Sequence, residues 1–329
     1  MKRCTPLFLL SMLFVLWAVN AQAIVATPPP VTPQLGFVGG DEPAPDSRGS
    51  VSGSGTGGCQ GIAGKPVAQS ASPYPTPTPI IPTLEWDPNA AYSLKEERTV
   101  GAYTIRVWQN SNSDSLLGFD GIVTIQALGQ PMAQVDMAAG LHELTGADIT
   151  GEGHPDAIIE TFSGGAHCCF STVVYDLGPT LTQVLRTPES NCSGHFEDLD
   201  ADGVMEFITC DDRFAYQYCC FAGSPAVKVI MKYTPGEGYL PASTGFRRLY
   251  AEDIANHTAA AETAAPGDFC EWDETTKCAV LPVVLDYLYS GQPDQAWSEL
   301  ARLYPYPDRE QFRQEILAGV GESPLYVFP

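Results

Sequence analysis

A nine-residue acidic pattern occurs twice in this chain, 50 residues apart, and it constrains the fold more than any other feature. The copies are DITGEGHPD at 148–156 and DLDADGVME at 198–206, and an apolar run follows each. A Cys-Cys-Phe sequence also recurs, at 168–170 and 219–221, at nearly the same offset from the start of each acidic pattern. Recurrence in register predicts two copies of one structural unit.

Short alternating apolar runs surround the two acidic segments, and clusters of Gly, Pro, Asn and Asp separate these runs. This pattern is typical of antiparallel strands joined by turns. We therefore predict a β-rich domain over residues 85–248. Its expected strands are 103–109, 121–128, 156–162, 171–177, 205–210 and 226–233.

The remaining residues, 249–329, have few strand signals and favour helices. Pro293 stands at the start of one predicted helix, and Asp308 with Gln311 resembles a capping box at the start of another. A short turn between the two predicts a helical hairpin. The side chains expected to be buried in it are Trp297, Leu300, Phe312 and Ile316.

The predicted fold class is therefore α+β. An antiparallel β-rich domain with two calcium-loop repeats, arranged as a partial propeller or a sandwich, precedes a helical C-terminal region. A complete propeller needs four to eight four-stranded blades, whereas this β-region has room for about three units.

The first 23 residues have the pattern of an export signal. Lys2 and Arg3 precede an apolar core at 7–19, and a small-x-small cleavage site follows at 21–23. Residues 24–84 are dominated by Pro, Gly, Ser and Thr, which predicts a disordered tether. We expect the mature chain to be extracytoplasmic, periplasmic or secreted, without a membrane span.

The chain is strongly acidic, with 17 Lys and Arg against 39 Asp and Glu and a formal net charge of −22. Such a balance repels phosphate backbones, so nucleic acid is not an expected partner. The same negative charge favours the binding of cations.

The spacing within each acidic segment suits Ca²⁺. Positions 1, 3 and 5 of a tight loop can turn side-chain oxygens inward, position 7 can offer its backbone carbonyl, and position 9 can close the coordination sphere. Mg²⁺ fits less well because it demands stricter octahedral geometry. The candidate ligands are Asp148, Thr150, Glu152, His154 and Asp156 in the first loop, and Asp198, Asp200, Asp202, Val204 and Glu206 in the second.

His154 and Val204 are expected to contribute carbonyl oxygens. The second loop carries four carboxylates and the first carries three. Since ligand charge tunes calcium affinity, the loops alone predict that the second binds more tightly.

With this pattern, residues 140–240 resemble the FG-GAP or VCBS repeat family, whose members carry D-x-D-x-D-G-x-x-D calcium loops between strands. The second loop fits that motif apart from Glu206 at its last position, and the first departs further at Thr150 and Glu152. The resemblance implies calcium-stabilised β-blades and a role in surface recognition. It does not imply catalysis.

Nine cysteines remain after the signal, and in an oxidising compartment most should be paired. We expect Cys59 to be left over and Cys270 to bond Cys278 across a short loop. Structural disulfides are the favoured interpretation of both Cys-Cys pairs. A zinc or copper site using His167 with Cys168 or Cys169, or thiol catalysis, are the alternatives.

The sequence therefore predicts an exported, calcium-stabilised and disulfide-bonded β-repeat protein. It would act as a binding or structural module of a cell envelope or surface, with a protein or glycan ligand. The alternative is a secreted or periplasmic metal-assisted hydrolase that uses carboxylates or His167 and His195.

Overall fold

A computed structural model describes residues 92–110, 120–164 and 169–328. All of these belong to one compact unit, which spans 68–329. The predicted signal peptide and tether, Cys59, His167 and Cys168 lie outside the described residues.

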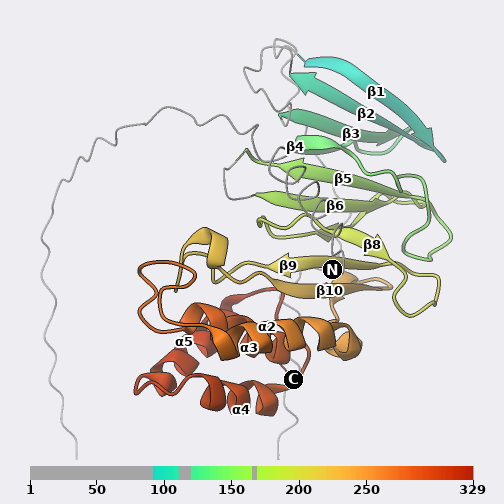
Figure 1. The fold of residues 1–329 in the computed structure, drawn as a ribbon. Coiled ribbons are helices and arrows are strands. Elements are labelled where there is room, and N and C mark those ends of the chain that lie inside the picture. Colours follow the sequence, from blue (N-terminus) through green and yellow to red (C-terminus); the bar gives the residue numbers. More distant parts are fainter. Residues whose placement is uncertain (1–91, 111–119, 165–168, 329) are drawn as a thin grey trace, which may run out of the picture. The chain divides into compact units, whose positions relative to one another are not determined.

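Seven strands form an antiparallel sheet in which each strand pairs with the next one along the chain (Figure 1). Short connections make this simple order possible because antiparallel neighbours need only a turn between them. The strands are β1 (Tyr92–Val100), β2 (Tyr103–Asn110), β3 (Gly121–Ala127), β4 (Ala133–Leu141), β5 (Asp156–Phe162), β6 (Phe170–Asp176) and β7 (Thr182–Arg186).

Four further strands form a second antiparallel sheet in the order β11-β10-β9-β8. They are β8 (His195–Glu197), β9 (Glu206–Asp211), β10 (Val227–Thr234) and β11 (Gly238–Pro241). Within the described residues neither sheet closes on itself. The predicted antiparallel β-rich architecture is thus confirmed, as an open arrangement of two sheets.

The two acidic segments occupy the same topological place. The first connects β4 to β5 and the second connects β8 to β9, and in each case three consecutive antiparallel strands follow the segment. Each acidic segment therefore lies between the first and second strands of a four-strand antiparallel series.

The strands β5 and β6 are buried on both faces. Ile158 and Val174 belong to a core shared with the second sheet and the helices, whereas Ile159 and Val173 belong to a second core on the opposite face. Burial on both sides explains why these strands have nearly continuous apolar runs instead of strict alternation.

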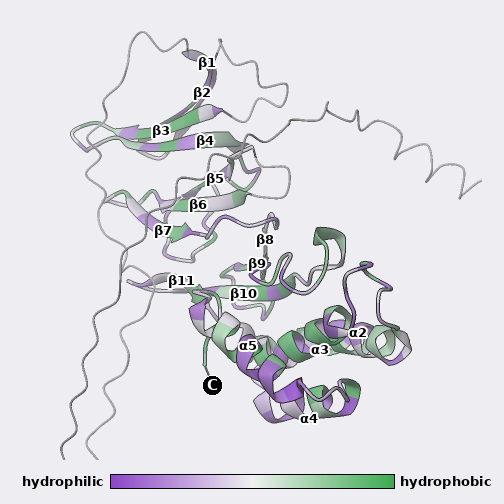
Figure 2. Cartoon of the chain, turned by 90° about the vertical axis from the view of Figure 1, so that its left-hand side faces the viewer, coloured by the Kyte–Doolittle hydropathy of each residue, from purple (hydrophilic) through white to green (hydrophobic). Residues whose placement is uncertain are grey.

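Four α-helices follow the sheets, as predicted for residues 249–329. They are α2 (Ala251–Thr263), α3 (Lys277–Tyr289), α4 (Pro293–Leu303) and α5 (Arg309–Glu322), with the 3-10 segments η1 (Phe221–Gly223) and η2 (Ser243–Tyr250) before them. The helix α3 is apolar around most of its surface (Figure 2) and lies against β10. No helix among the described residues is long and apolar enough to cross a membrane.

The hairpin of α4 and α5 buries Leu300, Phe312 and Ile316 as predicted. Two details were wrong. Trp297 is only partly buried, against the core and below the guanidinium of Arg313. Asp308 makes no capping bond at the start of α5, because it instead accepts a hydrogen bond from Tyr304 and pairs with Lys277.

The disulfides confirm cross-linking of the fold but correct one predicted bond. Cys270 does not pair with Cys278. Cys278, in the first turn of α3, bonds Cys219, while Cys270 bonds Cys220, so both cysteines reach the segment before η1. A third bond joins Cys192 to Cys210, and Cys169 is also disulfide-bonded. The neighbouring cysteines 219 and 220 thus have different partners.

Candidate functional site

The acidic segment 148–156 and its counterpart 198–206, here loop one and loop two, have similar internal hydrogen bonds, and in both the backbone N–H of position 6 donates to the carboxylate of position 1. At position 1, Asp148 accepts the backbone N–H of Gly151 at 2.7 Å and of Gly153 at 2.9 Å. Asp198 accepts the N–H of Asp202 and of Gly203, both at 3.1 Å. The first carboxylate therefore organises each turn and fixes where the following oxygens lie.

The closing acids at position 9 are fully buried. Oδ2 of Asp156 accepts the N–H of Ile149 at 2.8 Å, and Oε2 of Glu206 accepts the N–H of Leu199 at 2.9 Å. Of the two remaining oxygens, Oδ1 of Asp156 is buried without a hydrogen-bond partner, whereas Oε1 of Glu206 is buried 3.1 Å from the ammonium of Lys232. A buried carboxylate oxygen without a partner is costly unless a cation compensates it.

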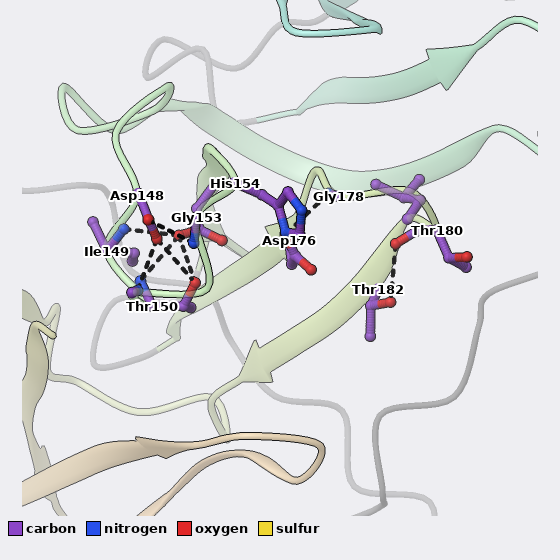
Figure 3. Close-up of polar contacts among 12 residues, drawn as sticks. Asp148, Ile149, Thr150, Gly153, His154, Asp176, Gly178, Thr180 and Thr182 are labelled. Carbon is purple, nitrogen blue, oxygen red and sulfur yellow. Dashed lines mark hydrogen bonds and ion pairs between the residues drawn. The ribbon is translucent and has the colours of Figure 1, made fainter.

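Thr150 completes the oxygen cluster of loop one. Its hydroxyl lies 3.5 Å from Oδ1 of Asp148 and 3.2 Å from Oδ2 of Asp156 (Figure 3). Burial raises the pKa of Asp156 to about 7, although its bonds to Ile149 and Thr150 act in the opposite direction. The pocket of loop one therefore disfavours a bare carboxylate.

Loop two brings together three acids from positions 1, 3 and 9. Single ligand atoms of Asp198, Asp200 and Glu206 lie within 4.8 Å of one another. Loop one has Thr150 at position 3, and so offers a hydroxyl there in place of the third acid. Both loops thus gather side-chain oxygen atoms from positions 1, 3 and 9.

The position-7 residues turn their side chains away from the clusters, which leaves their carbonyls as the available atoms. Nδ1 of His154 lies 3.7 Å from Asp176, and Figure 3 shows its ring beside that carboxylate. Val204 lies against the other loop, since a Cβ on Gly151 would be 2.9 Å from its side chain. The loops also share a backbone hydrogen bond, from the N–H of Met205 to the carbonyl of Ile149 at 2.9 Å.

Position 4 offers a test of the loop conformation, because the backbone is left-handed there in both loops. Gly151 has φ 73° and Ala201 has φ 60°. Since a left-handed residue other than glycine costs about 1 kcal/mol, we expect Ala201→Gly to raise the free energy of unfolding by about that amount. Urea denaturation in calcium-free buffer measures it. Gly151→Ala is the matched reverse change and should destabilise; equal effects of both substitutions would contradict the described turns.

Lys232 on β10 is a residue that the sequence analysis missed. Its Nζ lies 2.6 Å from Asp200, 2.7 Å from Asp202 and 3.1 Å from Oε1 of Glu206. Burial lowers its pKa, but the hydrogen bonds to these three carboxylates outweigh that effect and raise the pKa above its ordinary value. The ammonium therefore compensates the charge of loop two.

Asp176 at the end of β6 was also missed. It pairs with Asp156 across the sheet, and burial raises its pKa. Its Oδ1 accepts the N–H of Gly178 at 3.0 Å. A Cβ on Gly178 would be 2.9 Å from Nδ1 of His154, so glycine leaves room for that ring.

The histidines of the hydrolase alternative are not brought together in the described residues. His195 lies on β8 with an exposed side chain, 4.0 Å from Glu197, and His167 falls outside the description. A different pair, His257 and the buried Asp286, joins α2 to α3 at 2.6 Å. Its hydrogen bond to Asp286 raises the pKa of His257. The sequence gives no signal for this pair, because its residues are 29 positions apart.

Comparisons with known proteins give two distant relatives. A probable thylakoid lumen protein of Synechocystis is 26% identical over 165 residues, which is 48% of this chain and 45% of the relative. An uncharacterized protein of Sinorhizobium fredii is 27% identical over 103 residues, which is 30% of this chain and 16% of the relative. This chain thus spans less than half the length of either relative. No family model and no solved structure matches.

Proposed function

We propose that this protein is exported and that its calcium-stabilised, disulfide-bonded β-repeat region acts as a binding or structural module of a cell envelope or surface. One observation carries the proposal. Each acidic loop holds a fully buried closing acid; one oxygen of Asp156 in loop one has no hydrogen-bond partner, and the corresponding oxygen of Glu206 in loop two faces the ammonium of Lys232. Two equivalent loops, each with a buried acid whose charge needs a cation to compensate it, favour a cation-binding role over a surface turn.

The donor atoms favour a hard divalent cation. The candidate ligands are carboxylate, hydroxyl and backbone carbonyl oxygens, and Ca²⁺ takes six to eight such oxygens in flexible geometry. Sulfur and imidazole are absent from the set, since the ring of His154 lies beside Asp176. These residues fit Ca²⁺ better than a transition metal.

The export proposal is supported by the disulfides and by a relative. Disulfides persist in oxidising compartments, and three join cysteines of the described chain. The name of the Synechocystis relative refers to a lumenal protein, which agrees with a location outside the cytoplasm. The four-strand series around each loop is also compatible with the blades of FG-GAP-like repeats. A protein or glycan at the surface is the proposed partner.

Calorimetric titration of the purified, chelator-treated chain tests the calcium proposal. We expect Ca²⁺ to bind and to raise the melting temperature, with Mg²⁺ much weaker. Glu237→Gln removes one exposed carboxylate on the β10–β11 turn and should leave binding unchanged. Absence of binding, or equal binding of Mg²⁺ and Ca²⁺, would overturn the assignment.

A further inference from the structure

The surroundings of the two loops differ at one residue, which lies on the neighbouring strand beside the closing acid of each loop. In the first sheet Asp156 is paired with Asp176. In the second, Phe207 is paired with Met231, which places Lys232 beside Glu206 on the neighbouring strand. Asp176 and Lys232 therefore hold equivalent places, with opposite charge.

Lys232 lies where a cation in loop two would have to bind. Its ammonium contacts the acids at positions 3, 5 and 9, all within 3.1 Å. These are three of the five positions that would coordinate a metal ion. A divalent cation in loop two would have to displace the ammonium and then remain close to it.

Loop one has no such cation. Among the described residues, no lysine or arginine forms an ion pair with Asp148, Glu152 or Asp156. Oδ1 of Asp156 remains buried and without a partner. Asp176 adds a fourth carboxylate nearby, with a side chain only 17% exposed. The local field at loop one is therefore the more negative of the two.

On the basis of the calcium-binding function proposed above, we infer that the divalent cation binds at loop one, while Lys232 acts as the built-in counter-ion of loop two and excludes the metal there. This reverses the order of affinity expected from the loop sequences. The two copies then have different roles, since one is a metal site and the other is closed by an internal ion pair.

Calorimetry with CaCl₂ on the full chain tests the inference. The wild type should bind one Ca²⁺, Asp148→Asn should abolish that binding, and Asp198→Asn should leave it unchanged. Lys232→Met should raise the stoichiometry from one to two. Lys228→Met is the matched control, because Lys228 lies on the same strand but pairs with Asp253. Circular dichroism verifies that each variant is folded.

The outcomes separate the inference from the function on which it depends. Two sites in the wild type, or loss of binding in Asp198→Asn, would overturn the role of Lys232 and leave calcium binding intact. A folded Lys232→Met variant that still binds only one Ca²⁺ would also overturn the role of Lys232. If Lys232→Met does not fold, the Asp148→Asn and Asp198→Asn pair still decides which loop binds. No binding in any protein would overturn the calcium function itself.

Discussion

Replacing Cys219 and Cys278 together by alanine is expected to lower the free energy of unfolding by about 4 kcal/mol. The bond closes a separation of 59 residues. Removing a cross-link of that length raises the conformational entropy of the unfolded chain, which stabilises the unfolded state by about this amount. Both cysteines are 1% exposed, so alanine avoids placing new hydroxyl groups in the core. Urea denaturation of the oxidised proteins at saturating calcium measures the loss.

The bond between Cys192 and Cys210 provides the control. It closes a separation of only 18 residues, so its removal should cost less, about 3 kcal/mol. A larger loss from the shorter link, or a loss below about 1 kcal/mol from the longer one, would contradict a chain-entropy origin.

The sequence predicted correctly those strands whose residues are mostly buried and therefore apolar. The run at 156–162 coincides with β5, because that strand is apolar on both faces. The prediction missed β1, whose residues YSLKEERTV are largely exposed and charged. It also missed β4, because a bulge between Ala138 and Gly140 shifts the register against β5 and interrupts the alternation. Edge and bulged strands take their conformation from their neighbours rather than from their own residues.

Cysteine spacing predicted cross-links but not their partners. Cys270 and Cys278 are close in sequence, yet α3 begins at Lys277 and the sulfur atoms of both cysteines bond the segment before η1. The partners lie 50 and 59 residues away. Tertiary packing of α3 determines this pairing, and sequence distance carries no information about it.

The acidic positions of the candidate site could be predicted, whereas their charge compensation could not. The loop residues follow a fixed spacing, but Asp176 and Lys232 come from a neighbouring strand. Asp176 is 20 residues beyond Asp156, while Lys232 is 26 residues beyond Glu206. The extra residues, which include η1, hide the equivalence of the two positions in the sequence. The pairing of the strands in the structure shows that Asp176 and Lys232 are equivalent.

The buried acid of loop one should give the chelated protein a distinct pH dependence. The pKa of Asp156 is raised by burial from its ordinary 3.8 to about 7, so the folded state holds this proton more tightly than the unfolded state. The contribution of Asp156 to stability is therefore fully present below about pH 4, decreases as the pH rises, and is smaller by up to about 4 kcal/mol once the pH exceeds 7. Thermal melts in chelator between pH 4 and 8 measure this slope.

Asp156→Asn should remove that slope, because the amide oxygen can still accept the bonds from Ile149 and Thr150 without a charge. In chelator at pH 8 we expect the variant to be more stable than the wild type by up to about 4 kcal/mol. Calcium at 1,000 times its Kd should remove most of this difference, since binding stabilises the wild type by about 4 kcal/mol while the variant has lost a ligand charge. A variant less stable than the wild type in both conditions would show that hydrogen bonding at this position outweighs the cost of burying its charge.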